Sequence, residues 1–255
     1  ERTVVTWSAL ITGYTQNGLG DEALKCFRQM QNEDVYPDVV TYVCALKACG
    51  IVRCLEIGEE VDAEVRRQGL LRNNSIVLGN ALVDMYGKCG MLEKAQEVFD
   101  EIPIHDIVSW NACISGYAGE GNYLASVSMF EKLIQAGFKP TESTFSSVLS
   151  VCSQTGLVTT GFYCFESMLR FFGISPESKH YGSLVDLLGR AGDFKRIRVL
   201  LEQTHIQVDV ITWLSLLGAC QTHGNLALAK WVYDYVIKLH PDQANAYVLM
   251  SNMYT

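Results

Sequence analysis

Apolar residues along the chain recur at three- and four-residue steps, the spacing that places side chains on one face of an α-helix. Two such stripes follow one another near the start of the chain, the first made of Trp7, Leu10, Ile11 and Tyr14 and the second of Ala23, Leu24, Phe27 and Met30. Gly18 and Gly20 end the first stripe, Asp21 is placed to cap the second helix, and Pro37 marks its exit. No segment shows the sustained alternation that predicts strands. The pattern predicts two helices in succession.

This two-helix pattern returns at a fixed interval. The phrase Val5-Thr6-Trp7 is repeated 103 residues later as Val108-Ser109-Trp110 and again as Ile211-Thr212-Trp213. The same interval separates Gly18 from Gly121 and Gly224, and Phe27 from Phe130 and Tyr233. A chain of stacked units has no single globular core, so the interval predicts an all-α solenoid of helix-turn-helix repeats.

Each interval divides into three units of two helices. The units are cut as 4–38, 39–75, 76–106, 107–141, 142–177, 178–209 and 210–244, with 245–255 as the truncated start of an eighth. The segment Glu1-Arg2-Thr3 looks like the tail of a preceding unit. We therefore expect both ends to be interior to a longer protein, so the lack of a visible targeting segment says nothing about localisation.

Composition and charge narrow the function classes. The chain has 255 residues, 49% of them hydrophobic, which is enough apolar material to bury two stripes per unit, and no apolar run approaches the length of a membrane span. The net charge of −8 excludes nucleic-acid binding driven mainly by counterion release. A local basic run is placed either to contact phosphates or to form a solvated helix face; it consists of Arg190, Lys195, Arg196 and Arg198.

Nine cysteines raise the question of metal or disulfide sites. Cys49, Cys152 and Cys220 occupy one equivalent position late on the first helix of their units, where a small buried hydrophobe fits. The odd count and the lack of any Cys-x-x-Cys pair predict reduced thiols and no zinc.

Catalytic motifs are also missing. A nucleotide deaminase needs His-x-Glu and Pro-Cys-x-x-Cys, and none of the five histidines has Glu two residues on. The chain also lacks phosphate-binding glycine loops and Gly-x-Ser-x-Gly. We expect a non-catalytic segment without a cofactor.

Several segments resemble one family. Unit 39–75 contains Val39-Val40-Thr41-Tyr42 and Ala45-Leu46-Lys47-Ala48-Cys49, and unit 76–106 contains Gly79-Asn80-Ala81-Leu82-Val83-Asp84-Met85-Tyr86. These segments resemble the L and S motifs of pentatricopeptide repeats, in the plant (PLS) subclass where P-, L- and S-type motifs alternate. Residues 185–192 resemble the variant motifs that close such arrays, and residues 213–225 and 247–254 resemble the two extension (E) motifs that follow.

The resemblance assigns a type to each unit and implies a right-handed superhelical solenoid. Units 4–38 and 107–141 are P-type, 39–75 and 142–177 L-type, 76–106 and 178–209 S-type, 210–244 the first E motif and 245–255 the start of the second. The tetratricopeptide scaffold is the competing family. Its unit length stays at 34 whereas this one cycles, and Ile11 stands where its helix-packing glycine is expected.

The family resemblance further implies recognition of single-stranded RNA, with about one base read per repeat. In the family the fifth and last residues of a motif read the base edge, while the second residue packs against the bases. By alignment the pairs are Ser8 with Asp38, Asn80 with Asp106 and Asn111 with Thr141, and the packing residues are Val5, Val40, Val77 and Val108. The alternative is that the valines pack between helices and the polar residues cap them.

The same resemblance suggests which base each pair reads. A hydroxyl with Asp resembles the guanine-reading pair, Asn with Asp the uracil-reading pair, and Asn with Thr a pyrimidine reader. Val43 cannot bond a base edge, and neither Ser146 with Glu177 nor Gly182 with Asp209 matches an assignable pair, although Ser146 and Asp209 remain candidate RNA-binding residues. The expected readout from 5′ to 3′ is G, any, U, pyrimidine, any, any, a few nucleotides upstream of an edited cytidine.

These expectations combine into one functional hypothesis. The chain is expected to be the specificity module of a plant organellar cytidine-to-uridine RNA editing factor, with the mitochondrion favoured over the chloroplast. The resemblance implies a deaminase domain of the DYW type, following the chain or recruited in trans, and multiple organellar RNA editing factor (MORF) proteins as partners, with no membrane. The alternatives are a protein-binding helical scaffold, which the acidic balance suits, and an RNA processing or stability factor.

Overall fold

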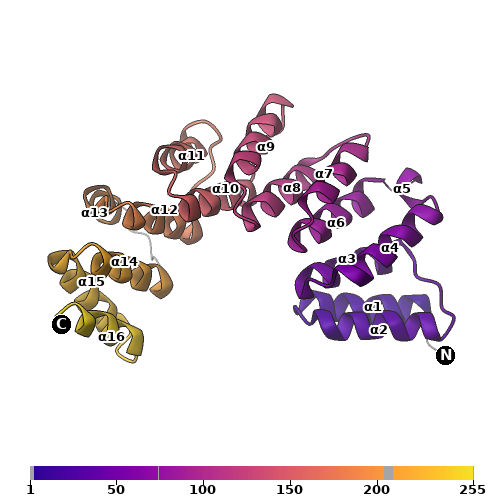
Figure 1. Ribbon diagram of the computed structural model, residues 1–255, viewed down its shortest axis with the longest axis horizontal. Helices are drawn as coiled ribbons and strands as arrows, with labels where there is room; N and C mark the ends of the chain where they lie inside the picture. Colours follow the sequence, from indigo (N-terminus) through magenta and orange to yellow (C-terminus); the bar gives the residue numbers. More distant parts are fainter. Residues whose placement is uncertain (1–2, 74, 204–208, 255) are drawn as a thin grey trace. The chain divides into compact units, whose positions relative to one another are not determined.

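The computed structural model describes residues 3–73, 75–203 and 209–254, and every regular element in these ranges is an α-helix (Figure 1). The chain forms two compact units, Glu1–Lys139 and Pro140–Thr255. Each unit is a stack of helix pairs, so the predicted all-α solenoid of two-helix repeats is confirmed. In the described ranges no helix combines the length and apolar character needed to cross a membrane.

The N-terminal unit contains two layers of helices. Its first layer consists of α1 (Val4–Gln16), α3 (Val39–Val52), α6 (Ser75–Lys88) and α8 (Ile107–Gly119). Its second layer consists of α2 (Gly20–Asn32), α4 (Leu55–Arg67), α7 (Leu92–Glu101) and α9 (Tyr123–Gln135), with the short α5 (Leu70–Asn73) between α4 and α6. Successive first-layer helices contact one another, and each of α2, α4 and α7 contacts the first helix of the next pair. Each of the first three pairs of this unit therefore packs against the pair that follows it.

The C-terminal unit repeats this arrangement. Its first layer consists of α10 (Glu142–Thr155), α12 (Ser178–Arg190), α14 (Val210–Thr222) and α16 (Ala244–Asn252). Its second layer consists of α11 (Val158–Arg170), α13 (Phe194–Gln203) and α15 (Leu226–Leu239). The first-layer helices again contact one another in chain order.

The predicted apolar stripes match the buried core, except at one residue. Trp7, Ile11, Phe27 and Met30 are buried as expected, but Leu10 is 40% exposed. The helix α1 packs against both α2 and α3, so its buried arc turns toward Ser8 and away from Leu10. A single stripe is too narrow for a helix with two packing partners.

The end of α1 is as predicted from the sequence, but the predicted N-cap of α2 is wrong. Gly18 adopts the left-handed backbone (φ 73°) just after α1, as a helix stop requires. The following helix starts at Gly20 with Leu19 as its N-cap, and Asp21 lies in the first turn instead of capping it. Gly20 is needed for packing, because a Cβ there would lie 2.6 Å from Val52 Cγ1 and 3.0 Å from the carbonyl oxygen of Ala48.

Two first-layer helices come into close backbone contact where α6 crosses α8. A Cβ added to Gly87 would lie 2.9 Å from the Cα of Gly116, and one added to Gly116 would lie 3.1 Å from the Cα of Gly87. Both glycines are buried, so neither helix has solvent to move into.

We therefore expect Gly87→Ala to lower the free energy of unfolding by about 1–3 kcal/mol, because the methyl group forces two backbones apart. Gly13→Ala is the matched control, since a Cβ there meets nothing within 4 Å and removes a flexible residue from α1. Chemical denaturation of both variants checks this. Equal stability of Gly87→Ala and Gly13→Ala would contradict the close packing of α6 and α8.

Candidate nucleic-acid interface

A row of valines is exposed at the N-terminal ends of the first-layer helices of the N-terminal unit. Val5 is 76% exposed, Val40 55%, Val77 57% and Val108 54%. Buried packing between helices therefore does not explain them. Ile211, at the equivalent place in the repeated phrase, is 73% exposed on α14, although it was not predicted from the sequence as a residue that packs against bases.

The predicted pair Ser8 and Asp38 is brought together where α3 begins. Asp38 is the N-cap of α3 and its Oδ1 accepts the backbone N–H of Thr41 at 2.8 Å and the Thr41 hydroxyl at 2.6 Å. The Ser8 hydroxyl lies 2.6 Å from that of Thr41 and donates to Asp38 Oδ1 at 3.4 Å. The three hydrogen bonds that Asp38 accepts from described residues all go to Oδ1. Its Oδ2 atom, on an exposed side chain, can therefore accept from another donor.

The predicted pair Asn80 and Asp106 is built in the same way where α8 begins. Asp106 Oδ1 accepts the backbone N–H of Ser109 at 2.8 Å and its hydroxyl at 3.0 Å, and Ser109 Oγ in turn accepts the N–H of Asp106. Asn80 Nδ2 donates to the same Oδ1 at 3.1 Å. The Oδ1 atom of Asn80 is buried and has no hydrogen-bond partner among the described residues.

Hydrogen bonding keeps both aspartates ionised. Burial acts to raise the pKa of Asp38, but the hydrogen bonds from Thr41 and Ser8 outweigh it and hold the pKa below its usual value. The pKa of Asp106 is likewise lowered, with burial outweighed by the bonds from Ser109 and Asn80. Both positions therefore present acceptors at neutral pH.

The third predicted pair is described one residue at a time, since its members belong to different compact units. Asn111 is half-buried on α8 in the N-terminal unit. Thr141 is the N-cap of α10 in the C-terminal unit and forms a capping box with Thr144. The reading of a base by these two residues stays a prediction.

The remaining candidates have other partners. Ser146 Oγ donates to the carbonyl of Glu142 at 2.8 Å and lies 3.0 Å from His180 Nε2. Asp209 caps α14 by accepting the N–H of Thr212 at 2.8 Å and its hydroxyl at 2.5 Å. Val43 is half-buried on α3.

No role was predicted from the sequence for the hydroxyl groups that donate to these aspartates. They belong to Thr41, Ser109 and Thr212. Each stands three residues after an acidic N-cap, and the spacing Asp-x-x-Ser or Asp-x-x-Thr is a capping signature that the sequence carried. His180 takes the same position after Glu177.

The basic run lies at the end of α12 and on α13, in the C-terminal unit. Arg190 pairs with Asp186 at 3.0 Å and Arg196 with Asp193 at 3.4 Å, and the Arg196 guanidinium also lies 5.3 Å from the Phe162 ring centroid. These internal partners favour the solvated-face interpretation for both arginines.

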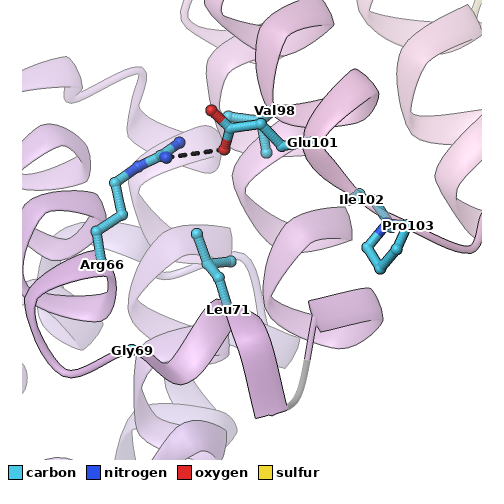
Figure 2. Close-up of a pocket in the computed structure, with 7 residues that line it drawn as sticks. All are labelled: Arg66, Gly69, Leu71, Val98, Glu101, Ile102 and Pro103. Carbon is cyan, nitrogen blue, oxygen red and sulfur yellow. Dashed lines mark hydrogen bonds and ion pairs between the residues drawn. The ribbon is translucent and has the colours of Figure 1, made fainter.

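A cavity of about 480 Å³ lies among α4, α5 and α7 (Figure 2). The Arg66 guanidinium beside it donates to Asp62 at 2.7 Å and to Glu101 at 2.8 Å, and Tyr86 donates to the other oxygen of Asp62 at 2.7 Å. Because its cation is already shared by two carboxylates, this cavity offers no unpaired positive charge to a phosphate. The rest of its lining is Gly69, Leu71, Val98, Ile102 and Pro103.

The three equivalent cysteines are fully buried. Burial raises the pKa of the Cys49 thiol to about 12 and those of Cys152 and Cys220 to about 11, which suits packing residues. In the part of the chain that the structure describes, no three His, Cys, Asp or Glu side chains are grouped to hold a metal ion.

Stacked helix pairs, with a polar cluster where one first-layer helix meets the start of the next, define an α-helical repeat protein. Models of the PPR repeat family match residues 2–50 and 105–154, those of the PPR repeat match 80–107 and 143–171, and that of the pentatricopeptide repeat domain matches 196–240. The chain belongs to the pentatricopeptide repeat family.

Its relatives include organellar proteins of Arabidopsis thaliana. The chain is 41% identical over 255 residues to the chloroplastic pentatricopeptide repeat-containing protein CRR2, of which it covers 38%. It is 37% identical over 254 residues to the mitochondrial pentatricopeptide repeat-containing protein At2g03380, of which it covers 37%. In both comparisons 99% or more of this chain is aligned. The chain thus spans about two fifths of these relatives.

Solved structures share the fold. The crystal structure of the pentatricopeptide repeat protein PPR10 from maize matches 100% of this chain and 42% of its own, with a TM-score of 0.65 at 17% identity. PPR10 in complex with an 18-nt psaJ RNA element matches 99% of this chain and 43% of its own, with a TM-score of 0.65 at 20% identity.

We expect Thr41→Val to raise the pKa of Asp38 toward its ordinary value, because the variant removes a hydroxyl that stabilises the carboxylate. A folded-state pKa held below the unfolded one adds stability that is lost as pH falls through it, so the variant also loses less stability on acidification. Carboxyl NMR titration checks this, with Asp106 as the unaffected control. An unchanged Asp38 pKa would show that the hydroxyl does not hold the acid.

Proposed function

We propose that this chain binds single-stranded RNA and selects bases through the polar clusters at the starts of its first-layer helices. The carrying observation is the arrangement of Asn80, whose Nδ2 donates to Asp106 while its buried Oδ1 lacks a partner. A buried unpaired acceptor costs about 1–3 kcal/mol, and a ligand N–H that reaches it recovers this cost.

The orientation of the Asn80 amide follows from the acid beside it. An ionised carboxylate accepts hydrogen bonds only, so the amide turns its NH₂ group toward Asp106 and its oxygen away. The N3–H group of uracil is a donor with a carbonyl on either side, which matches the free Oδ1 and the second Nδ2 hydrogen. Cytosine has an acceptor at N3 and meets Oδ1 unfavourably. The cluster is therefore suited to uracil.

The exposed valines supply the apolar part of the proposed site. Val77 and Val108 lie at the starts of α6 and α8, the helices that carry Asn80 and Ser109. A base inserted beside them covers apolar surface that is otherwise in water, which is favourable at about 25 cal/mol per Å². This contact is independent of base identity and supports affinity in a chain of net charge −8.

Relatives support RNA as the ligand class. PPR10, whose fold this chain shares, has been crystallised with an 18-nt psaJ RNA element. We infer the same class of ligand here because the exposed valine recurs in each unit of the N-terminal stack and a polar pair is formed in two of them. The acidic charge suits a protein-binding scaffold instead, and that scaffold predicts indifference to base identity.

The proposal extends to site selection for cytidine-to-uridine editing in a plant organelle. It is supported by the resemblance of units 178–209, 210–244 and 245–255 to the terminal S and E motifs, and by the organellar relatives. In this proposal the deaminase is of the DYW type, either further along the protein or in trans, and MORF proteins dock on L-type units such as 39–75.

We expect Asn80→Thr to change the preference of unit 76–106 from uracil to guanine, because a hydroxyl beside Asp106 copies the Ser8 and Asp38 arrangement. A mismatch at this nucleotide is expected to cost about 1–3 kcal/mol. The measurement is a gel-shift series at matched salt on RNAs that differ only opposite this unit. The reciprocal variant Ser8→Asn is the matched control, and should move unit 4–38 from guanine to uracil. Indifference of wild type and both variants to the varied bases would favour the protein scaffold.

The isolated chain is expected to bind target RNA without deaminating it, because it lacks the His-x-Glu and Pro-Cys-x-x-Cys set. Its affinity should be unchanged after chelation and dialysis, and metal analysis should find no stoichiometric zinc. One tightly held zinc per chain, or uridine formed from a target cytidine, would overturn the assignment of chemistry to another domain.

A further inference from the structure

The last residue of a unit accepts a hydrogen bond from the side chain of the third residue of the next unit. Thr41, Ser109 and Thr212 each donate to an aspartate in this way, at 2.6 Å, 3.0 Å and 2.5 Å. The unit that starts at Ser178 has His180 in this position, after Glu177 in place of an aspartate.

His180 engages the fifth residue of the preceding unit. It is fully buried, and its Nδ1 accepts the backbone N–H of Glu177 at 3.0 Å, so in the neutral ring Nε2 carries the proton. That Nε2 lies 3.0 Å from Ser146 Oγ and 3.1 Å from the carbonyl oxygen of Glu142. Ser146 therefore faces a donor where Ser8 faces a carboxylate.

The single proton of the Ser146 hydroxyl goes to the carbonyl of Glu142 at 2.8 Å, and one of its lone pairs accepts from the imidazole. The hydroxyl therefore does not donate to a carboxylate as Ser8 does. The exposed Glu177 carboxylate pairs with Lys179 at 3.0 Å. Unit 142–177 therefore lacks the arrangement of hydroxyl, acid and second hydroxyl that unit 4–38 has.

We propose that His180 is a specificity-determining residue that silences unit 142–177 as a base reader, because its imidazole contacts Ser146 in the place where Ser8 has a carboxylate. This inference rests on the proposed function, because silence has meaning only where other units read bases. The third residue of the following unit thereby determines whether the fifth and last residues of a unit are available to an RNA base. This third residue lies on the next first-layer helix.

The test restores a reading pair in this unit. The double variant Glu177→Asp with His180→Thr recreates the Pro-Asp-x-x-Thr sequence that folds at residues 37–41, since Pro176 already stands in place. Wild type is expected to bind RNAs varied opposite unit 142–177 equally, and the double variant to prefer guanine by about tenfold. Glu177→Asp alone keeps the imidazole and should stay indifferent.

A second variant does not depend on rebuilding the cap. Ser146→Ala should leave the affinity for every RNA in the series within about twofold of wild type, because the hydroxyl already donates to the Glu142 carbonyl and contacts the imidazole of His180. A larger loss for one base would overturn the proposal, as would a wild-type preference at this nucleotide. So would indifference of a double variant whose melting temperature matches wild type. Loss of base preference opposite units 4–38 and 76–106 would instead overturn the proposed function.

Discussion

The start of each first-layer helix is the constraint on which the proposed site depends. A helix N-terminus has backbone N–H groups without partners, and a side-chain oxygen at the N-cap can satisfy one of them. In this chain the N-cap is also the last residue of the preceding unit, so Asp38 and Asp106 stand between two first-layer helices. Capping of the helix therefore positions a carboxylate between the first-layer helices of two successive units.

This double placement explains how one residue supports both fold and recognition. Asp106 Oδ1 binds the N–H and hydroxyl of Ser109, which secures α8, and it also orients the amide of Asn80 on α6. The amide oxygen then has no partner among the described residues, and Val77 and Val108 are exposed at the starts of the same two helices. Recognition needs rigid donors and acceptors, and the cap makes these groups rigid before any ligand arrives.

The fold could be predicted from the sequence because helical spacing is a local signal and because the whole pattern returns after 103 residues. Two details failed for the same reason. Leu10 was assigned to the core and Asp21 to a cap, whereas the packing of α1 on both neighbours and the close approach of Gly20 to α3 decided both. Tertiary contacts between repeats outweigh the preferences of single residues.

The candidate site was accessible from the sequence only in part. Ser8 with Asp38 and Asn80 with Asp106 follow from the family alignment, and the structure brings each pair within hydrogen-bonding distance. The unpaired oxygen of Asn80 and the contact of His180 with Ser146 depend on side-chain orientation across a helix interface. No linear spacing carries that information.

The central claim is that Asn80 Oδ1 accepts an N–H from a base. It is tested most directly by placing N3-methyluridine at each uridine of a bound RNA in turn, with 5-methyluridine at the same position as the control. At the nucleotide opposite unit 76–106, the N3-methyl group should weaken binding by about 1–3 kcal/mol while the 5-methyl group, which is away from the reading edge, leaves it unchanged. Equal binding of the two modified RNAs at every position would contradict the account.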